Sequence, residues 1–310
     1  MSEFDQKQSV VIWRYLDGRR GHETQTLGLV EALSVHLSIT CYDIPIPSKA
    51  RALKQWLFGG VPSEGRMPPD LIIAAGHGTH IPLLATRRWV GGRTVLIMKP
   101  SLPRRWFDLC IIPAHDQPSP ADNIIVTEGG LNRVQPVTDQ HLDKGLFLIG
   151  GPSKHHGWDQ NSLIKSIEAI IEKQSSLCWT LTTSPRTPDD FVSGLASLSS
   201  KRVTVVPFEQ TRPDWLPAQL AQSAWSWVSE DSVNMVYESL TSGCGVGVLP
   251  MPRNKKSRLV DGLDQLAEKG SITTFAQWQQ GQALEPLSAP LCETRRCARE
   301  IVRRWYPSQN

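Results

Sequence analysis

Residues 9–42 have the sequence SVVIWRYLDGRRGHETQTLGLVEALSVHLSITCY, in which strand-like and helix-like segments follow one another. Ser9–Trp13 is a short apolar run of the kind that forms a buried strand, and Asp17–Gly21 is a loop with two glycines. Apolar residues then recur at helical spacing through Thr24–Val35, and Leu37–Tyr42 is strand-like again. This succession predicts parallel strands joined by a helix that packs on them.

The same alternation continues along most of the chain. Further apolar strands are expected at Leu71–Ala75, Thr94–Met98, Leu109–Ile112 and Asn123–Val126. The segment Leu131–Lys144 is polar and has no sustained periodicity, and after it the pattern begins again. We expect strands at Gly145–Ile149, Leu177–Thr182, Val203–Val206, Ser223–Val228 and Gly245–Leu249, with helices at Gln160–Lys173, Pro188–Leu198, Ser232–Thr241 and Arg258–Lys269.

Two successive runs of alternating strands and helices predict two α/β domains, each with a parallel sheet. A length of 310 residues agrees, since domains have roughly 100–200 residues. We expect an N-terminal domain over residues 1–135 and a C-terminal domain over residues 145–290, with a hinge near 131–145. A basic helix, Cys292–Trp305, should occupy the last segment, 291–310, and pack near the hinge.

Charge and composition exclude several classes of protein. The 33 Lys and Arg residues nearly balance the 30 Asp and Glu residues, so bulk charge does not indicate a nucleic-acid partner. No apolar run approaches the ~20 residues that cross a bilayer, and the N-terminus is polar. Six cysteines show no CxxC spacing. We expect a reduced cytoplasmic protein, and leave open a peripheral association with the inner membrane.

Candidate functional residues lie directly after the expected strands, where open parallel sheets bind ligands. The first region follows Ser9–Trp13, the second follows Leu71–Ala75, and a paired third region follows two strands of the second half. In this order, the candidates are Asp17, Gly18, Gly21, His22, Glu23 and Gln25; Gly76 and His77; and Gly150, Gly151, Ser153, Ser229, Ser232, Met235 and Glu238.

Each region also has a purely structural interpretation. The first fits a tight turn with a capped helix, and Ser or Asp at a helix start is usually only a cap. A Gly-Gly loop beside an exposed helix N-terminus, however, suits a diphosphate. Carboxylates at that helix end would repel phosphate if they pointed inward. We therefore expect Glu230 and Asp231 to cap the helix or face solvent.

Metal and dinucleotide sites have weaker support. His77 and His80 could begin a metal site, but no third ligand follows at matching spacing, and no DxD motif occurs. Gly18 and Gly21 give only part of a dinucleotide fingerprint, although Asp43 resembles its ribose-binding acid. No tyrosine has a lysine four residues later, as a short-chain epimerase requires. We expect neither a metal nor a cofactor.

Seven segments in order carry a family resemblance. They are LDGRRGHETQTLGLVEAL, PDLIIAAGHGTH, FDLCIIPAHD, GGLNRV, LIGGPSKHHGW, SEDSVNMVYESLTSGCGVGVLP and RLVDGLDQLAEKGSITTF. Together they resemble the mitochondrial fission elongated-mitochondria family, here in the form of its bacterial members. Plant proteins of that family recruit a dynamin-related fission protein, whereas bacterial members have been labelled nucleoside-diphosphate-sugar epimerases.

That family is similar in turn to the GT-B glycosyltransferases, which implies two Rossmann-like domains with parallel sheets facing a cleft. The resemblance implies an acceptor on the N-terminal domain and a nucleotide donor on the C-terminal domain. Ser229 and Ser232 would face phosphate and Glu238 the ribose, in a helix that ends at Gly243. His22 or Glu23 would activate the acceptor, with Asp17 as an orienting partner.

The resemblance implies a metal-independent GT-B-type glycosyltransferase that uses a nucleotide sugar in bacterial envelope glycan assembly. Its partners would be the nucleotide sugar and a glycan or lipid-linked acceptor. Two alternatives stay open. One is a non-catalytic adaptor with a GT-B-like fold, and the other is a nucleoside-diphosphate-sugar epimerase.

Overall fold

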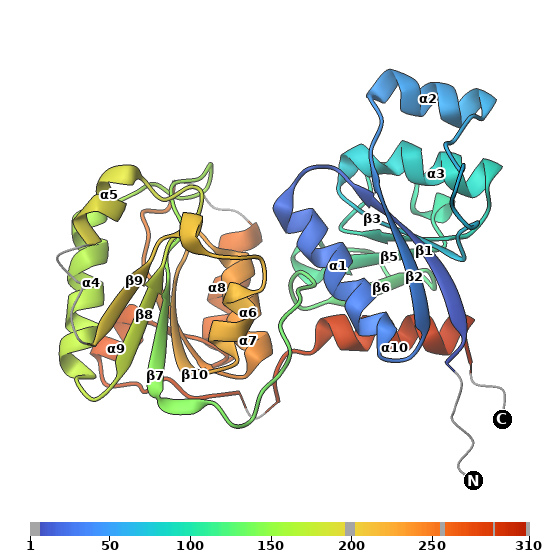
Figure 1. Ribbon diagram of the computed structural model, residues 1–310. Helices are drawn as coiled ribbons and strands as arrows, with labels where there is room; N and C mark the ends of the chain where they lie inside the picture. The colour runs from blue at the N-terminus through green and yellow to red at the C-terminus, as the bar shows by residue number, and fades with distance from the viewer. Residues whose placement is uncertain (1–6, 196–201, 255–257, 288, 308–310) are drawn as a thin grey trace, which may run out of the picture. The chain divides into compact units, whose positions relative to one another are not determined.

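Parallel strands form two separate sheets in the computed structural model, which describes residues 7–195, 202–254, 258–287 and 289–307 (Figure 1). The chain divides into two units. Unit 1 comprises Met1–Arg133 and Glu293–Asn310, and unit 2 comprises Val134–Cys292. All pairings between strands of these sheets are parallel in the described parts of the chain. The predicted fold class, α/β with two parallel sheets, is confirmed.

Unit 1 has a six-stranded sheet of order β2-β1-β3-β4-β5-β6 among its described residues. Its strands are β1 (Ser9–Leu16), β2 (Ser38–Pro45), β3 (Leu71–Ala75), β4 (Arg93–Ile97), β5 (Leu109–Pro113) and β6 (Ile124–Thr127). Its helices are α1 (Arg20–Ser34), α2 (Lys49–Phe58), α3 (His80–Trp89) and α10 (Glu293–Trp305), with a short 3-10 turn at His77–Thr79.

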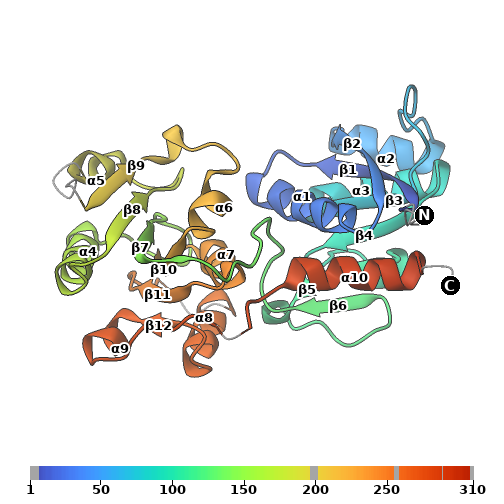
Figure 2. The same cartoon turned by 60° about the horizontal axis from the view of Figure 1, so that its bottom comes forward.

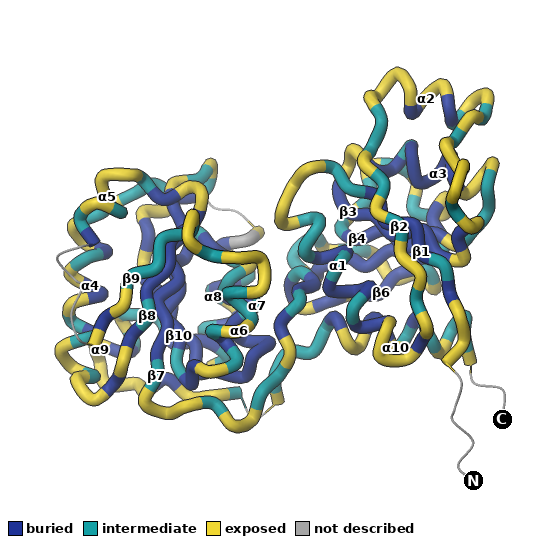
Figure 3. The backbone as a smooth tube through the Cα atoms, in the orientation of Figure 1, coloured by how far each residue is buried: buried dark blue, intermediate teal, exposed yellow. Residues whose placement is uncertain are grey.

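The central strands β3, β4 and β5 of unit 1 are buried on both faces, whereas the edge strand β2 is largely exposed (Figure 3). Because side chains alternate along a strand, Leu71 and Ile73 of β3 enter one apolar cluster and Ile72 enters another. The first cluster contains side chains of α1 and α10, and the second contains side chains of α3. This two-sided burial explains why the strands are apolar without strict alternation.

The basic C-terminal helix α10 belongs to unit 1, where it packs beside α1 (Figure 2). Cys297, Ala298 and Ile301 are fully buried in the cluster that α1 covers. The hydroxyl of Thr294 binds the backbone of Asn132 in both directions, accepting from its N–H and donating to its carbonyl oxygen. The apolar side of an arginine-rich helix therefore completes a core whose other residues lie far away in the sequence.

Unit 2 has the strand order β12-β11-β10-β7-β8-β9 within the described residues. Its strands are β7 (His141–Leu148), β8 (Cys178–Thr182), β9 (Val203–Val206), β10 (Ser223–Ser229), β11 (Gly245–Leu249) and β12 (Thr273–Thr274). Its helices are α4 (Gln160–Lys173), α5 (Asp189–Gly194), α6 (Trp215–Leu220), α7 (Val233–Ser242), α8 (Arg258–Glu268) and α9 (Phe275–Gln279).

Most expected elements lie within a few residues of the observed ones, but three predictions need correction. The first helix begins at Arg20 rather than Thr24, because the polar stretch before Thr24 is already helical. Helices α2, α3, α6 and α9 were not predicted. The helix expected at Pro188–Leu198 is observed as Asp189–Gly194, and residues 196–198 lie outside the described residues.

None of the described helices has the length and apolar composition that a bilayer crossing requires. All six cysteines have free thiols.

Candidate functional site

The candidate residues of each unit gather where the strand order changes direction. In unit 1 that point lies between β1 and β3, and in unit 2 between β7 and β10. Connections leave such neighbouring strands in opposite directions, which opens a crevice at their carboxyl ends. The loop after β1 and Gly76 after β3 meet at the first point. The loop Gly150–Ser153 and residues 230–232 meet at the second.

Asp17 and His22 form a hydrogen-bonded pair at the edge of unit 1. His22 lies in the first turn of α1, and its Nδ1 donates to Asp17 Oδ2 at 2.7 Å. The other Asp17 oxygen accepts from the backbone N–H of Arg19 at 3.1 Å, and both side chains of the pair are largely buried. Because Nδ1 carries the donated proton, the neutral ring has Nε2 as its acceptor. This is the arrangement of an oriented general base.

Gly76 lets the His22 ring lie close to the backbone after β3. Its φ is +85°, and a Cβ at this position would lie 2.4 Å from Nδ1 of His22 and 3.1 Å from Asp17 Oδ2. A side chain of any other residue would therefore displace the ring. The candidate residue Gly76 thus shapes the pocket of the histidine through its backbone.

Glu23 organises the loop in which Asp17 lies. Its Oε1 accepts from the N–H of Gly18 at 3.0 Å, and its backbone oxygen accepts from Nη1 of the buried Arg14 at 3.1 Å. Arg14 also pairs with Asp43, with an Nε to Oδ1 distance of 2.6 Å. Asp43, which resembles the ribose-binding acid of dinucleotide sites, is therefore paired with an arginine of β1.

The remaining candidates of unit 1 differ in exposure. Gly21 lies within α1, and Gln25 is buried with an Oε1 that finds no hydrogen-bond partner in the described part of the chain. His77 is exposed, whereas His80 is buried and its Nδ1 lies 3.2 Å from Ser101 Oγ. Burial first, and the neighbouring His77 second, lower the pKa of His80 to about 4. His80 is therefore a neutral core histidine.

In unit 2, the Gly-Gly loop is bound by the last residue of β10 and by the residues that follow it. The N–H of Gly150 donates to the buried Ser229 Oγ at 2.7 Å, and the N–H of Gly151 donates to Asp231 Oδ2 at 2.9 Å. A Cβ at Gly150 would lie 2.1 Å from Ser232 Oγ. The loop and the start of α7 are thus packed backbone against side chain, and only glycine fits.

The expectation that Glu230 and Asp231 cap the helix or face solvent is wrong. Both are buried, and each is paired with an arginine that the sequence analysis did not single out. Arg186 Nη2 binds Asp231 Oδ2 at 2.7 Å, and Arg253 Nε binds Glu230 Oε1 at 2.6 Å. Both inward carboxylates are therefore paired, and the arginine side chains stay 42% and 44% exposed. Arg253 is shared, because its Nη1 and Nη2 also bind Asp264 at 3.0 and 2.7 Å.

These arginines come from two further strand ends. Arg186 follows β8 and Arg253 follows β11, so four neighbouring strands contribute to one edge. Ser232, the N-cap residue of α7, has its Oγ within 3.3 Å of Arg186 Nη2. No local motif distinguishes Arg186 in the sequence. For Arg253, the basic run after the strand Gly245–Leu249 was the available signal.

The other candidates of unit 2 lie around this edge. The Oγ of Ser153 accepts from the N–H groups of His155 and His156, both at 3.1 Å, and closes a turn after the Gly-Gly loop. Met235, in the first turn of α7, is partly buried against the apolar core of unit 2. Glu238 lies one turn further along the same helix and is half-buried. Across the described residues, no group of three His, Cys, Asp or Glu side chains converges as metal ligands.

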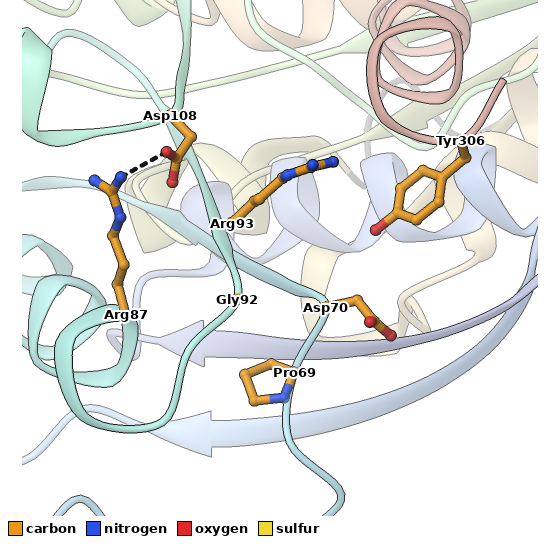
Figure 4. Close-up of a pocket in the computed structure, with 7 residues that line it drawn as sticks. All are labelled: Pro69, Asp70, Arg87, Gly92, Arg93, Asp108 and Tyr306. Atoms are coloured by element: carbon orange, nitrogen blue, oxygen red, sulfur yellow. Dashed lines mark hydrogen bonds and ion pairs between the residues drawn. The ribbon is translucent and has the colours of Figure 1, made fainter.

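A pocket of about 500 Å³ lies at the opposite, amino-terminal edge of the unit 1 sheet (Figure 4). The two aspartates that line the pocket accept hydrogen bonds from residues near the beginnings of β1 and β4. Asp70 accepts from the N–H of Val11 at 2.7 Å, and Asp108 accepts from both the N–H and the hydroxyl of Thr94 at 2.9 Å. Asp108 also pairs with Arg87. This pocket is distinct from the carboxyl-edge residues that the sequence indicated.

Solved structures share this architecture. A UDP-GlcNAc 2-epimerase from Methanocaldococcus jannaschii matches with a TM-score of 0.60 and 12% identity, over 96% of this chain and 100% of that chain. MurG from Acinetobacter baumannii matches with 0.52 and 13%, over 96% and 99%. The calicheamicin glycosyltransferase CalG4 matches with 0.51 and 13%, over 97% and 95%. At such identities the likeness shows the fold alone, that of the GT-B proteins.

No curated protein matches the sequence. A family model does, and it is described as Mitochondrial fission ELM1. The match extends over residues 20–305 and so includes the first turn of α1, the Gly-Gly loop after β7 and the whole of α10. The chain therefore belongs to the mitochondrial fission ELM1 family.

Proposed function

We propose that this chain is a metal-independent glycosyltransferase that moves the sugar of a nucleotide sugar onto a hydroxyl group of a glycan or lipid-linked acceptor. The observation that carries the proposal is the Asp17–His22 pair, joined at 2.7 Å. It leaves Nε2 as a base at the carboxyl edge of the unit 1 sheet. A hydroxyl nucleophile needs such a base.

In the proposed reaction, His22 Nε2 takes the proton of the acceptor hydroxyl. The hydroxyl oxygen then attacks the anomeric carbon of the donor sugar. The new carbon–oxygen bond replaces the bond to the diphosphate, which leaves as a nucleoside diphosphate. Asp17 stabilises the imidazolium that forms, since its carboxylate already accepts from Nδ1. A positioned general base of this kind typically contributes roughly 10²–10⁴-fold to the rate.

The proposed donor site is the edge of unit 2. Leaving-group charge would be stabilised by Arg186 and by the N-terminus of α7, whose first N–H groups lack helical partners. Arg186 is held by a buried carboxylate but remains partly exposed, so it can bind phosphate oxygens. Arg253 is bound by both Glu230 and Asp264, so its role would be to hold the loop after β11 in place. Ser232 would meet the phosphate, Ser229 and the glycines would shape the loop, and Glu238 would bind the ribose.

The biological setting is part of the proposal. We assign the reaction to bacterial envelope glycan assembly because the motifs of this chain resemble, at a distance, transferases of peptidoglycan and lipid A synthesis. The nucleotide base, the sugar and the acceptor are outcomes of the experiment below.

One comparison favours a second candidate function. Solved structures of this fold include proteins named UDP-GlcNAc 2-epimerases, one of them with a TM-score of 0.60. The missing Tyr-x-x-x-Lys pair argues against a short-chain epimerase only, so it has no bearing on an epimerase of the present fold. An epimerase would alter the nucleotide sugar itself and would need no acceptor.

Binding and product analysis separate these functions. The protein is first tested for thermal stabilisation by UDP-, GDP-, ADP-, CMP- and dTDP-sugars, with NAD as a control. A ligand at a hundredfold excess over Kd stabilises by about 2.7 kcal/mol. The bound nucleotide sugar is then followed by NMR with and without a glycan or lipid-linked acceptor.

We expect a free nucleoside diphosphate and a new glycoside only when the acceptor is present. A new nucleotide sugar formed without acceptor would show epimerisation instead. The absence of any nucleotide binding would contradict both enzymatic functions and favour the adaptor.

A further inference from the structure

Helix α2 exposes apolar side chains on the side of α3 that faces away from the unit 1 sheet (Figures 1 and 3). Phe58 is 77% exposed, Leu53 48% and Leu57 44%. Trp89, at the end of α3, is exposed beside them, and its Nε1 donates to the carbonyl oxygen of Trp56 at 3.1 Å. We call the side chains of Leu53, Leu57, Phe58 and Trp89 the α2 surface.

The orientation of α2 produces this exposure. Its buried residues are Ala52 and Gln55, and the helix packs on α3. Because successive residues of an α-helix turn by about 100°, Ala50, Lys54 and Leu57 lie on the opposite side. A helix on the surface of a water-soluble domain normally directs its leucines toward the core. Here two leucines and a phenylalanine are left outside.

Basic residues surround the apolar ones. Lys49, Arg51 and Lys54 are all exposed, and α2 contains no acidic residue. The guanidinium of Arg88 lies over the Trp89 ring, 5.1 Å from its centroid. The α2 surface therefore combines exposed apolar side chains with surrounding charges that are all positive within α2.

Two possible occupants of such a surface can be compared. A second copy of the chain would bring two helices with only basic charges together, which is electrostatically unfavourable. An anionic bilayer offers acyl chains to the apolar residues and phosphate to the basic ones. Tryptophan and long basic side chains are also the residues that favour a membrane–water boundary.

We propose that the α2 surface docks on an anionic lipid bilayer. Helix α2 lies parallel to the membrane plane, with Leu53, Leu57 and Phe58 at the acyl boundary and Lys49, Arg51 and Lys54 at the headgroups. The attachment is peripheral and reversible, since one short helix provides it. It does not depend on the proposed glycosyl transfer, because bilayer binding requires no nucleotide sugar.

Vesicle cosedimentation of the full-length protein tests the proposal without nucleotide sugar. We expect binding to phosphatidylcholine vesicles that contain phosphatidylglycerol, and only weak binding to phosphatidylcholine alone. Binding should fall as the salt concentration rises, because surface charges are screened. The double variant Leu57→Asp/Phe58→Asp should lose binding. The matched control is Leu142→Asp, which changes a leucine that is 71% exposed in unit 2 and should leave binding unchanged.

Charge variants test the basic part. Arg51→Gln and Lys54→Gln should each lower vesicle partitioning by about fivefold, the effect of one basic residue near an anionic surface. Lys165→Gln, an exposed lysine of α4, is the control. Circular dichroism and thermal midpoints verify that each variant folds.

Several outcomes would overturn the proposal. They are no binding of the wild type, equal binding to both vesicle types, and unchanged binding of Leu57→Asp/Phe58→Asp. A dimer in analytical ultracentrifugation that this double variant abolishes, together with persistent vesicle binding, would assign the surface to a second copy instead.

Discussion

The Asp17–His22 pair makes the sharpest prediction at the scale of single residues. His22→Ala should lower the turnover of nucleotide sugar by roughly 10²–10⁴-fold, because the acceptor hydroxyl loses its base. Asp17→Asn should also lower turnover, since the imidazolium loses its carboxylate partner. Nucleotide affinity, measured by calorimetry, should stay the same in both. His36→Ala, an exposed histidine after α1, is the control, and full activity of His22→Ala would refute the role.

The buried His80 predicts a pH dependence of stability. Its pKa is lowered to about 4 in the folded protein by burial and by His77, whereas an unfolded histidine has a pKa of about 6.5. As the pH falls between these values, the unfolded chain takes up the proton first, so stability should decline. His80→Asn should remove part of this acid sensitivity in thermal midpoints. The exposed His36→Asn should not, and equal behaviour of the two variants would contradict the assignment.

At the scale of elements, Arg186 in the loop after β8 pairs with Asp231 in the loop after β10. Substitutions of this pair should distinguish its contribution to stability from its contribution to nucleotide binding. Arg186→Gln leaves Asp231 buried without its cation, so it should lower both stability and nucleoside diphosphate affinity. Arg186→Gln/Asp231→Asn removes both charges and should regain stability but not affinity. The lost affinity should be about 1.5–3 kcal/mol, as for hydrogen bonds to charged groups. Recovery of affinity in the double variant would make Arg186 purely structural.

Helix α7 makes a second prediction about the donor. Glu238 lies one to two turns from the helix start that would meet the phosphates, which suits contact with the ribose. Glu238→Ala should weaken a nucleoside diphosphate by about 1.5–3 kcal/mol and inorganic pyrophosphate hardly at all. Isothermal titration with both ligands measures the difference. Equal losses of affinity for the two ligands would show that Glu238 maintains the structure of α7 rather than binding the ribose.

At the scale of the whole molecule, α10 completes unit 1 from the far end of the chain. Ile301 is fully buried against side chains of α1 and the sheet, so Ile301→Ala should destabilise unit 1 by about 2–5 kcal/mol. Hydrogen exchange should increase in β1, β3 and α1 and stay unchanged in unit 2. Arg299→Ala, an exposed residue of the same helix, is the control. Increased exchange confined to unit 2 would contradict this division.

The candidate site was predictable only in part. Asp17 and His22 are five residues apart, and one turn of chain brings them together, so their neighbourhood follows from the local sequence. Arg186 lies 45 residues before its partner Asp231, and Arg253 lies 23 residues after its partner Glu230. Each arginine follows a different strand from the one that its acid follows. Only the order of strands in the sheet makes these pairs. For that reason, the inward direction of both carboxylates was missed.

The sequence by itself determined that two parallel α/β sheets form, because continuous apolar strands and amphipathic helices have periodicities that local chemistry sets. It also determined which loops follow the strands and carry glycine, histidine and serine. The tertiary structure alone decided that α10 belongs to unit 1, that α2 turns its leucines outward and that two arginines pair with the acids before α7. These features depend on contacts between residues distant in the chain, whose pairing no local pattern encodes.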